Sequence, residues 1–326
     1  MAHQAGAYPG FFFPQADKKL LLTATRKAQS FKMVSLSECI PWMIVSLAES
    51  VAIVALNLCT IIVFMRNRNL RKRSTYLVMS LAVIDMFVGG VVVRNEFYVF
   101  GVQCNLWQWH FIEYWTIFLT LVLIYLFPIA SLTNITIIAL ERVHATFCPL
   151  RHRVLKNWVY GLIIAVVWIT SGLVPVSSTL LLFEERQYNI YTLYTFISIC
   201  LVIICVSYAS IVIKVRFGVQ PQHHGATLRE RKLTMTLLIV TVVSLLLYLP
   251  HVVIVLAIHI SKSEVVWSVP FRSSVYTTRL LFFANSVVNP IVYVIRMPEC
   301  RSAYFALFRR RAQRQRQVAM LPLRNM

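Results

Sequence analysis

A glutamate and an arginine stand together at the end of a long apolar stretch. In the segment 131–151, SLTNITIIALERVHATFCPLR, Glu141 and Arg142 follow a run that has no charged side chain. Ionisable side chains are costly inside a membrane, and those that persist there usually serve a function. The alternative interpretation is that Arg142 reaches the lipid headgroups as a topological anchor. We therefore treat the pair as a candidate functional site, with the anchor as its competitor.

A second group of polar side chains is interspersed in the apolar runs. Asp85 lies in SLAVIDMF and Asn289 in ANSVVNPIVY, and Asn285 shares a helical face with Asn289 because the two are four residues apart. Ser131 stands about three turns before Arg142, on the same face. Their carboxylate, hydroxyl and amide oxygens are suitable ligands for a small hard cation or for water, with Asp85 as the charge. The alternative is a hydrogen-bonded packing network without an ion.

The composition is that of a membrane protein. Of the 326 residues, 58% are hydrophobic and 13% are charged, and the mean hydropathy is +0.69. The formal net charge of +20 collects in the short segments between apolar runs and in the C-terminal tail. Anionic lipid and topology rules explain that distribution, so we do not expect a nucleic-acid partner.

Seven apolar runs have the length of about 20 residues that a helix needs to cross the hydrocarbon core. They lie at roughly 40–65, 75–100, 113–141, 158–183, 191–215, 233–260 and 273–296. The connecting segments near 66–73, 151–156 and 214–232 are basic, whereas the alternate segments hold most of the acids. This asymmetry predicts an extracellular N-terminus and a cytosolic C-terminal tail. The predicted fold is an all-α membrane protein, a seven-transmembrane helix bundle with a short amphipathic C-terminal helix.

The chain is expected to divide into four parts. They are a disordered extracellular tail at 1–38, the seven-transmembrane domain at 39–297, an interfacial helix at 298–312 and a cytosolic tail at 313–326. Pro298 and Glu299 can begin the interfacial helix. Its apolar face would consist of Ala303, Tyr304, Leu307 and Phe308. The alternative for this segment is a disordered basic tail.

The order of the motifs resembles that of the rhodopsin-like (class A) G-protein-coupled receptors over nearly all of residues 50–310. The matching residues are Asn57, Leu81-Ala82 with Asp85, Glu141-Arg142, Pro149-Leu150-Arg151, Trp168, Tyr208, Pro250 and Asn289-Pro290-Ile291-Val292-Tyr293. The resemblance implies a plasma-membrane receptor that passes an extracellular ligand signal to a heterotrimeric G protein. It does not imply an enzyme.

The resemblance also implies an ion site and a switch. Its sodium site, whose occupancy favours the inactive state, would be formed by Asp85, Ser131, Asn285 and Asn289. Arg142 is similar to the arginine that is held by the neighbouring acid, Glu141, and by a second acid at the inner end of span six, for which Glu230 is the candidate. When span six tilts outward, a cavity for the G protein opens.

Further positions correspond to moving parts of the family. Tyr208 and Tyr293 match the tyrosines that stabilise the active arrangement through water. Pro250, preceded by Tyr248, supplies the hinge in span six, and Pro290 lies in the span-seven motif. The chain departs from the family because Tyr248 replaces a tryptophan and Cys200 replaces the span-five proline. Coupling between the ligand site and the inner end must therefore use other packing.

The outer cysteines also differ from the family pattern. Ile117 stands at the expected start of span three, and the segment 183–192 contains no cysteine, so the usual extracellular disulfide is not expected. Cys39 and Cys104 either pair with each other or remain free thiols.

The ligand remains open among small molecules, lipids and peptides. Amine receptors place an aspartate where this chain has Ile124, and opsins need a span-seven lysine that residues 273–296 lack, so no retinal is expected. The candidate ligand-binding residues are Arg94, Glu113, Ile124, His251 and Arg279. The two arginines suit a carboxylate or phosphate, and the alternative is that they form salt bridges with acids of the outer segments.

Two other classes of membrane protein are less consistent with the sequence. A transporter or channel would show an internal repeat and helices that are broken at the midplane, and the sequence has no such repeat. A membrane hydrolase would need histidines at metal-ligand spacing, and the eight histidines are scattered.

Overall fold

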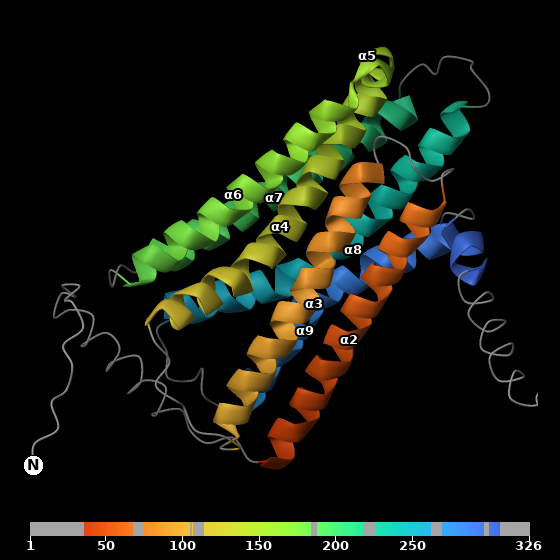
Figure 1. Ribbon diagram of the computed structural model, residues 1–326. Helices are drawn as coiled ribbons and strands as arrows, with labels where there is room; N and C mark the ends of the chain where they lie inside the picture. Colours follow the sequence, from red (N-terminus) through yellow and green to blue (C-terminus); the bar gives the residue numbers. More distant parts are fainter. Residues whose placement is uncertain are drawn as a thin grey trace, which may run out of the picture.

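The computed structural model is a bundle of long helices (Figure 1). It describes residues 36–67, 75–104, 106, 114–183, 188–217, 226–261, 269–296 and 300–306. The long helices in this part of the chain are α2 (Leu36–Arg66), α3 (Thr75–Gln103), α4 (Tyr114–Phe147), α6 (Asn157–Phe183), α7 (Tyr188–Phe217), α8 (Ala226–Ser261) and α9 (Val269–Arg296). The short helix α5 (Pro149–Val154) follows α4, and residues 300–306 are also helical.

Each of the seven expected membrane spans coincides with one long helix, apart from residue 113 of the third span, which lies outside the described residues. Helices α2, α4, α6, α7 and α9 are apolar over a length sufficient to cross a bilayer. The apolar stretches found in α3 and α8 are shorter, at Thr75–Val91 and Val242–Ala257, because the adjoining side chains at 92–100, 241 and 258–260 lie outside the described ones. The described residues contain no strand. The predicted class, an all-helical membrane bundle, is confirmed.

Helix α4 occupies the centre of the bundle and packs against α3, α6, α7 and α8. In its most apolar stretch 61% of the residues are buried, whereas in α6 only 22% are. Helix α6 instead exposes large apolar side chains, among them Leu162, Ile169 and Leu173. Apolar residues on the outside of a membrane bundle face lipid. The central position of α4 therefore explains why its polar residues can interact with several other helices.

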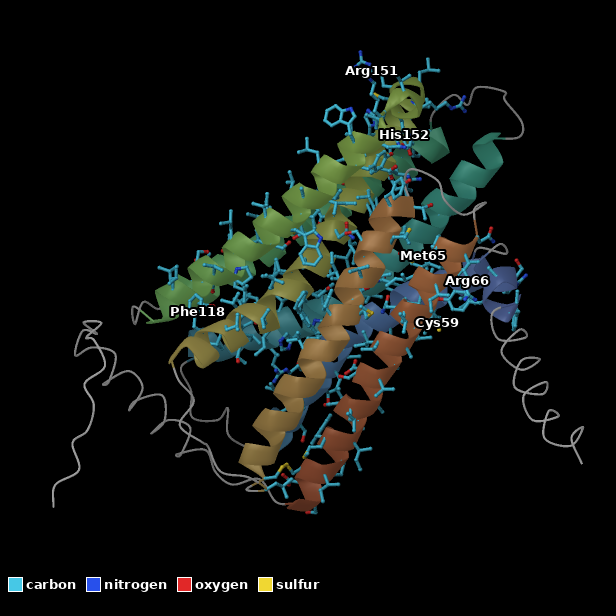
Figure 2. The ribbon with its side chains drawn as sticks, in the orientation of Figure 1. Cys59, Met65, Arg66, Phe118, Arg151 and His152 are labelled. Carbon is cyan, nitrogen blue, oxygen red and sulfur yellow. A yellow bond between two sulfur atoms is a disulfide. The ribbon has the colours of Figure 1, made fainter. Side chains whose placement is uncertain are left out.

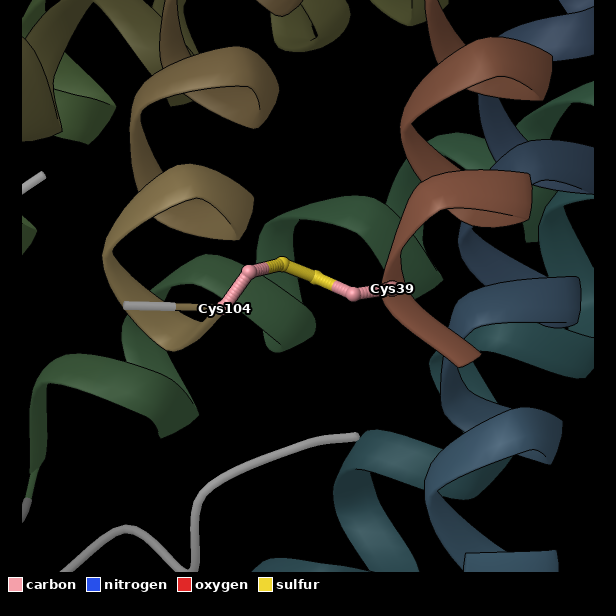
Figure 3. Close-up of a disulfide and its surroundings, with 2 residues drawn as sticks. All are labelled: Cys39 and Cys104. Atoms are coloured by element: carbon pink, nitrogen blue, oxygen red, sulfur yellow. A yellow bond between two sulfur atoms is a disulfide. The ribbon is translucent and has the colours of Figure 1, made fainter. Parts of the chain in front are cut away.

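The two ends of the bundle carry different residues. Arg66, Arg151 and His152 lie at one end, which we call the α5 end, and Phe118 lies at the other (Figure 2). At that second end a disulfide joins Cys39, in the first turns of α2, to Cys104, just after α3 (Figure 3). Their Cα atoms are 6.1 Å apart. Of the two alternatives that the sequence left for these cysteines, the structure has the pair, and we call this end the disulfide end.

The helical residues 300–306 pack against α2. Cys300 and Tyr304 are buried, while Phe305 on the other side of the turn is exposed. The Tyr304 hydroxyl forms a hydrogen bond with Thr60 Oγ1 of α2. Burial raises the pKa of Tyr304 to about 12, so the hydroxyl is neutral at physiological pH. Leu307 and Phe308 of the expected apolar face lie outside the described residues, as do the expected tail at 313–326 and residues 1–35 of the expected tail at 1–38. Residues 36–38 of that tail, which were expected to be disordered, instead form the first turn of α2.

Candidate functional site

The centre of the bundle contains a buried carboxylate that accepts hydrogen bonds from two other helices. Asp85 of α3 is fully buried. Its Oδ1 accepts hydrogen bonds from Ser131 Oγ of α4 at 2.7 Å and from Ser286 Oγ of α9 at 2.9 Å. Its Oδ2 accepts one from Asn289 Nδ2 at 2.7 Å. A buried carboxylate is tolerated when donors surround it in this way. The structure therefore joins three of the four residues that the sequence grouped together.

Asn285, the fourth residue, takes a different partner. Its Nδ2 donates to the Tyr248 hydroxyl of α8 at 3.1 Å. The side-chain oxygens of Asn285 and Asn289 are buried and accept no hydrogen bond from the described residues. Ser286 takes the direct contact with Asp85 that was expected of Asn285. Its spacing of three residues from Asn289 places it on the same helical face, a signal that the sequence contained.

Asn57 fixes the backbone of α9 at the level of this cluster. Its Nδ2 donates to the backbone oxygen of Ser286 and to that of Ile53, each at 2.9 Å. Asn57 is 1% exposed, so water does not compete for these hydrogen bonds. The contact holds α2 against α9 at the residue that donates to Asp85.

We define the Asp85 cluster as Asp85, Ser131, Ser286 and Asn289. Beside it, Asn285 begins a line of contacts toward the half of the bundle nearer the disulfide end. Tyr248, which accepts from Asn285, packs edge-on against Phe282 with ring centroids 4.8 Å apart. Phe282 in turn contacts His251, with centroids 5.1 Å apart. Tyr248 therefore supplies both an aromatic contact and a polar one.

The second candidate site lies near the α5 end. Arg142 is 2% exposed, and its guanidinium forms an ion pair and a hydrogen bond with Oε2 of Glu141. The other oxygen of Glu141 lies 2.7 Å from Nε2 of His152 and accepts a 3.4 Å hydrogen bond from the Tyr160 hydroxyl. An arginine that reached for the lipid headgroups would be exposed, so the anchor interpretation of Arg142 is wrong. His152 belongs to α5 and Tyr160 to α6, and sequence reasoning identified neither.

The remaining switch candidates are partly described. Tyr208 and Tyr293 are both buried in the large apolar core, 5% and 2% exposed. Pro250 and Pro290 each lie within a continuous helix. The side chain of Glu230 lies outside the described residues, so its pairing with Arg142 stays a prediction.

Three of the five ligand candidates are described. Ile124, His251 and Arg279 each stand ten residues from the terminus of their helix at the disulfide end, about 15 Å along the axis. Nδ1 of His251 is buried without a hydrogen bond to any described residue. Cζ of Arg279 lies 6.0 Å from the ring centroid of Phe283. Arg94 and Glu113 lie outside the residues whose side chains are described.

The polar side chains of the described residues join helices to one another. No group of three or more histidine, cysteine, aspartate or glutamate side chains is placed to hold a metal ion in the part of the chain that the structure describes. The polar residues instead form hydrogen-bonded and ionic contacts between helices.

The known proteins that the chain resembles are membrane receptors. The family described as "7 transmembrane receptor (rhodopsin family)" matches residues 56–189 and 178–293, well over half of the chain. The chain is 24% identical to the human melanocortin receptor 3 over 283 residues, which covers 78% of this chain and 82% of that receptor. It is 27% identical to the dog histamine H2 receptor over 270 residues and 26% identical to the guinea-pig histamine H2 receptor over 268 residues. Each of these two alignments covers 74% of this chain and 72% of the histamine receptor.

Proposed function

The chain belongs to the rhodopsin family of seven-transmembrane receptors, and from this premise we propose that it passes an extracellular ligand signal to a heterotrimeric G protein. The relatives that it matches are receptors and not enzymes. In the proposed mechanism α8 moves outward at the α5 end, and Arg142 changes partners as it does so. The ligand drives the change because it binds one arrangement of the helices more tightly than the other.

The observation that carries the proposal is the burial of Arg142 against a shared acid. A guanidinium that is 2% exposed needs a compensating charge, and Glu141 supplies it. Glu141 is held in turn by His152 and Tyr160, so its position depends on α5 and α6 as well as α4. A movement of α8 would give Arg142 new neighbours, for which the buried hydroxyls of Tyr208 and Tyr293 are the candidates.

We place the α5 end in the cytosol and the N-terminus outside the cell. Arg66, Arg151, Arg153 and Lys156 support this orientation, since basic residues gather on the cytosolic side of membrane proteins. The plasma membrane is the proposed location. The cavity that opens between the helices would receive the C-terminal helix of a G-protein α subunit, as a helix in a groove.

We further propose that the Asp85 cluster accepts a sodium ion. Hard cations take oxygen ligands, and this region offers the Asp85 carboxylate and two serine hydroxyls. The buried side-chain oxygens of Asn285 and Asn289, which accept no hydrogen bond from described residues, also fit such an ion. When bound, the ion would supply charge compensation for Asp85. The protein residues would then hold α3, α4 and α9 together in the resting arrangement.

The test is nucleotide exchange on a G protein. Membranes that contain the full chain are mixed with purified heterotrimers representing each α-subunit class, and basal GTP-analogue uptake is measured. We expect uptake above that of empty membranes, and we expect Arg142→Ala to reduce the excess at least tenfold. Arg151→Ala, which removes an exposed charge at the same end, should leave most of it. Uptake that is unchanged by Arg142→Ala at matched receptor amounts would remove the switch from the mechanism.

A further inference from the structure

A shallow groove of about 450 Å³, which we call the α5 groove, lies where the short helix α5 meets the start of α6. It is lined by three apolar residues, Leu150, Val154 and Leu155, and by two cations, Arg151 and Lys156. Leu150 and Val154 are each 77% exposed, so other described residues cover little of their surface. A surface that combines cations with exposed apolar groups is suited to an anion that also has an apolar part.

The two cations of the α5 groove have no counter-ion among the described residues. Arg151 lies at the α5 end of the bundle (Figure 2). Neither its side chain nor that of Lys156 forms a hydrogen bond or an ion pair within the part of the chain that the structure describes. The stretch 142–183 contains no acidic residue, and Glu141, which precedes it, already binds two other side chains. Both charges of the groove are therefore available to a ligand.

The α5 groove adjoins a face of α6 that contacts lipid. Five large apolar side chains are exposed on one side of this helix, because they follow one another at intervals of three or four residues. They are Trp158, Leu162, Val166, Ile169 and Leu173. Helix α6 is long and apolar enough to cross a bilayer, so this stripe faces hydrocarbon. Lys156 directly precedes α6, which places the groove at the boundary between lipid tails and headgroups.

The number of charges indicates which headgroup fits the α5 groove. A phosphate monoester carries a charge of about −1.5 to −2 at neutral pH, and two cations balance it. Arg151 can bind two phosphate oxygens through its planar guanidinium, and Lys156 supplies a point charge. A phosphate diester has a single ionisable oxygen and would leave one of the cations uncompensated. Because the cations adjoin the apolar residues directly, the monoester must lie close to the acyl chains.

We propose that the α5 groove binds phosphatidic acid, the phospholipid in which a phosphate monoester is attached directly to the glycerol. The phosphate binds Arg151 and Lys156, and an acyl chain follows the exposed stripe of α6 that begins at Trp158. A protein partner fits less well, because this stripe lies within the bilayer. The site lies apart from the contact between Glu141 and Arg142, so it goes beyond the proposed function and holds or fails independently of it.

The test measures how tightly the full-length receptor retains lipid. The receptor is purified in micelles of a neutral detergent, lipid is titrated in, and native mass spectrometry counts the lipid molecules bound to each receptor. Dioleoyl phosphatidic acid should bind at least fivefold more tightly than dioleoyl phosphatidylserine, whose phosphate is a diester. Soluble glycerol phosphate, which has the headgroup without the chains, should not bind at the same concentrations.

Variants of neighbouring basic residues distinguish the α5 groove from a general attraction between charges. Arg151→Gln and Lys156→Gln should each weaken phosphatidic acid binding at least fivefold. Arg153→Gln is the matched control, because Arg153 belongs to the same short helix but does not line the groove. It should bind phosphatidic acid within twofold of the parent. In micelles without anionic lipid the two groove variants should melt as the parent does, which shows that they fold.

Several results would overturn the proposal. Equal losses in Arg153→Gln and Lys156→Gln, or phosphatidylserine binding as tight as that of phosphatidic acid, would show that any anionic lipid is attracted to this end. Tighter binding of a phosphatidylinositol monophosphate would mean that the headgroup lies farther from the chains. Absence of phosphatidic acid binding would also overturn the site. If Lys156→Gln then weakened nucleotide exchange, the groove would be assigned to the G protein instead.

Discussion

Nε2 of His152 lies 2.7 Å from Oε1 of Glu141, eleven residues before it in the chain. The contact attaches the short helix α5 to the acid that holds Arg142. Both carboxylate oxygens of Glu141 are therefore engaged, one by Arg142 and the other by His152 together with Tyr160. Glu141 is 8% exposed, so water has little access to its carboxylate and would not replace a hydrogen-bond donor that is lost.

Substitution of His152 by alanine should destabilise the receptor. The Oε1 atom of Glu141 would keep only the 3.4 Å contact from Tyr160. A hydrogen bond to a charged group contributes about 1.5–3 kcal/mol, and we expect a loss within this range. The measurement is the melting temperature of the purified receptor. Arg151→Ala on the same short helix is the control, and equal melting of the two variants would show that the His152 contact contributes nothing.

A second prediction concerns the close packing of α2 and α3 at Gly89. A Cβ atom at Gly89 would lie 2.8 Å from Cγ2 of Val54 and 3.1 Å from Cβ of Ile53. Ile53 is fully buried, and both neighbours are β-branched and stiff within a helix. Gly89→Ala should therefore force the helices apart and cost about 1–3 kcal/mol, the usual cost of overpacking.

The adjacent glycine provides a matched control for that prediction. A Cβ atom at Gly90 would have no heavy atom within 4 Å. Gly90→Ala should leave the melting temperature unchanged or raise it slightly, since alanine favours a helix by roughly 1 kcal/mol. The measurement is the melting temperature of Gly89→Ala and of Gly90→Ala in the same lipid. A stable Gly89→Ala receptor would mean that α2 and α3 are not in close contact there.

The positions of the membrane helices could be predicted from the sequence because each span is a long apolar run. The structure has one helix at each of these runs. The sequence was also sufficient to group Asp85 with Ser131 and Asn289, because polar side chains within apolar membrane spans are expected to face the interior of the bundle. The pairing of Cys39 with Cys104 was left open because cysteine positions do not determine connectivity.

Other parts of the sites could not be predicted from spacing. Asn285 and Asn289 share a face, yet only Asn289 donates to Asp85, because Tyr248 of another helix takes the Asn285 amide. His152 lies in a six-residue helix without apolar periodicity, so no pattern indicated that its ring would turn back to Glu141. Such contacts depend on how separate helices meet in space.

The stability that the contact between residues 300–306 and α2 contributes should decrease at high pH. Tyr304→Phe removes the hydrogen bond with Thr60 and should cost about 0.5–1.5 kcal/mol. Burial raises the pKa of Tyr304 to about 12, above the value of about 10 for an exposed tyrosine. The stability that the neutral hydroxyl contributes is thus fully present below about pH 10 and is lost as the pH rises through 12.

The measurement for Tyr304 is the difference in melting temperature between the parent and Tyr304→Phe. The difference should be constant from about pH 6 to 9 and should shrink above about pH 10. Phe305→Ala, which alters an exposed side chain of the same helix, should show no such trend. A difference that already declines between pH 6 and 9 would contradict a buried, neutral hydroxyl.

Sodium should stabilise the receptor through Asp85. We expect a higher melting temperature in sodium chloride than in the chloride of a bulky organic cation at equal ionic strength, because a ligand that binds only the folded state stabilises it. Asp85→Asn removes the charge, keeps the shape and should abolish the difference. Ser171→Ala, at a fully buried serine of α6 outside the cluster, should retain it. A sodium effect that persists in Asp85→Asn would place the ion elsewhere in the protein.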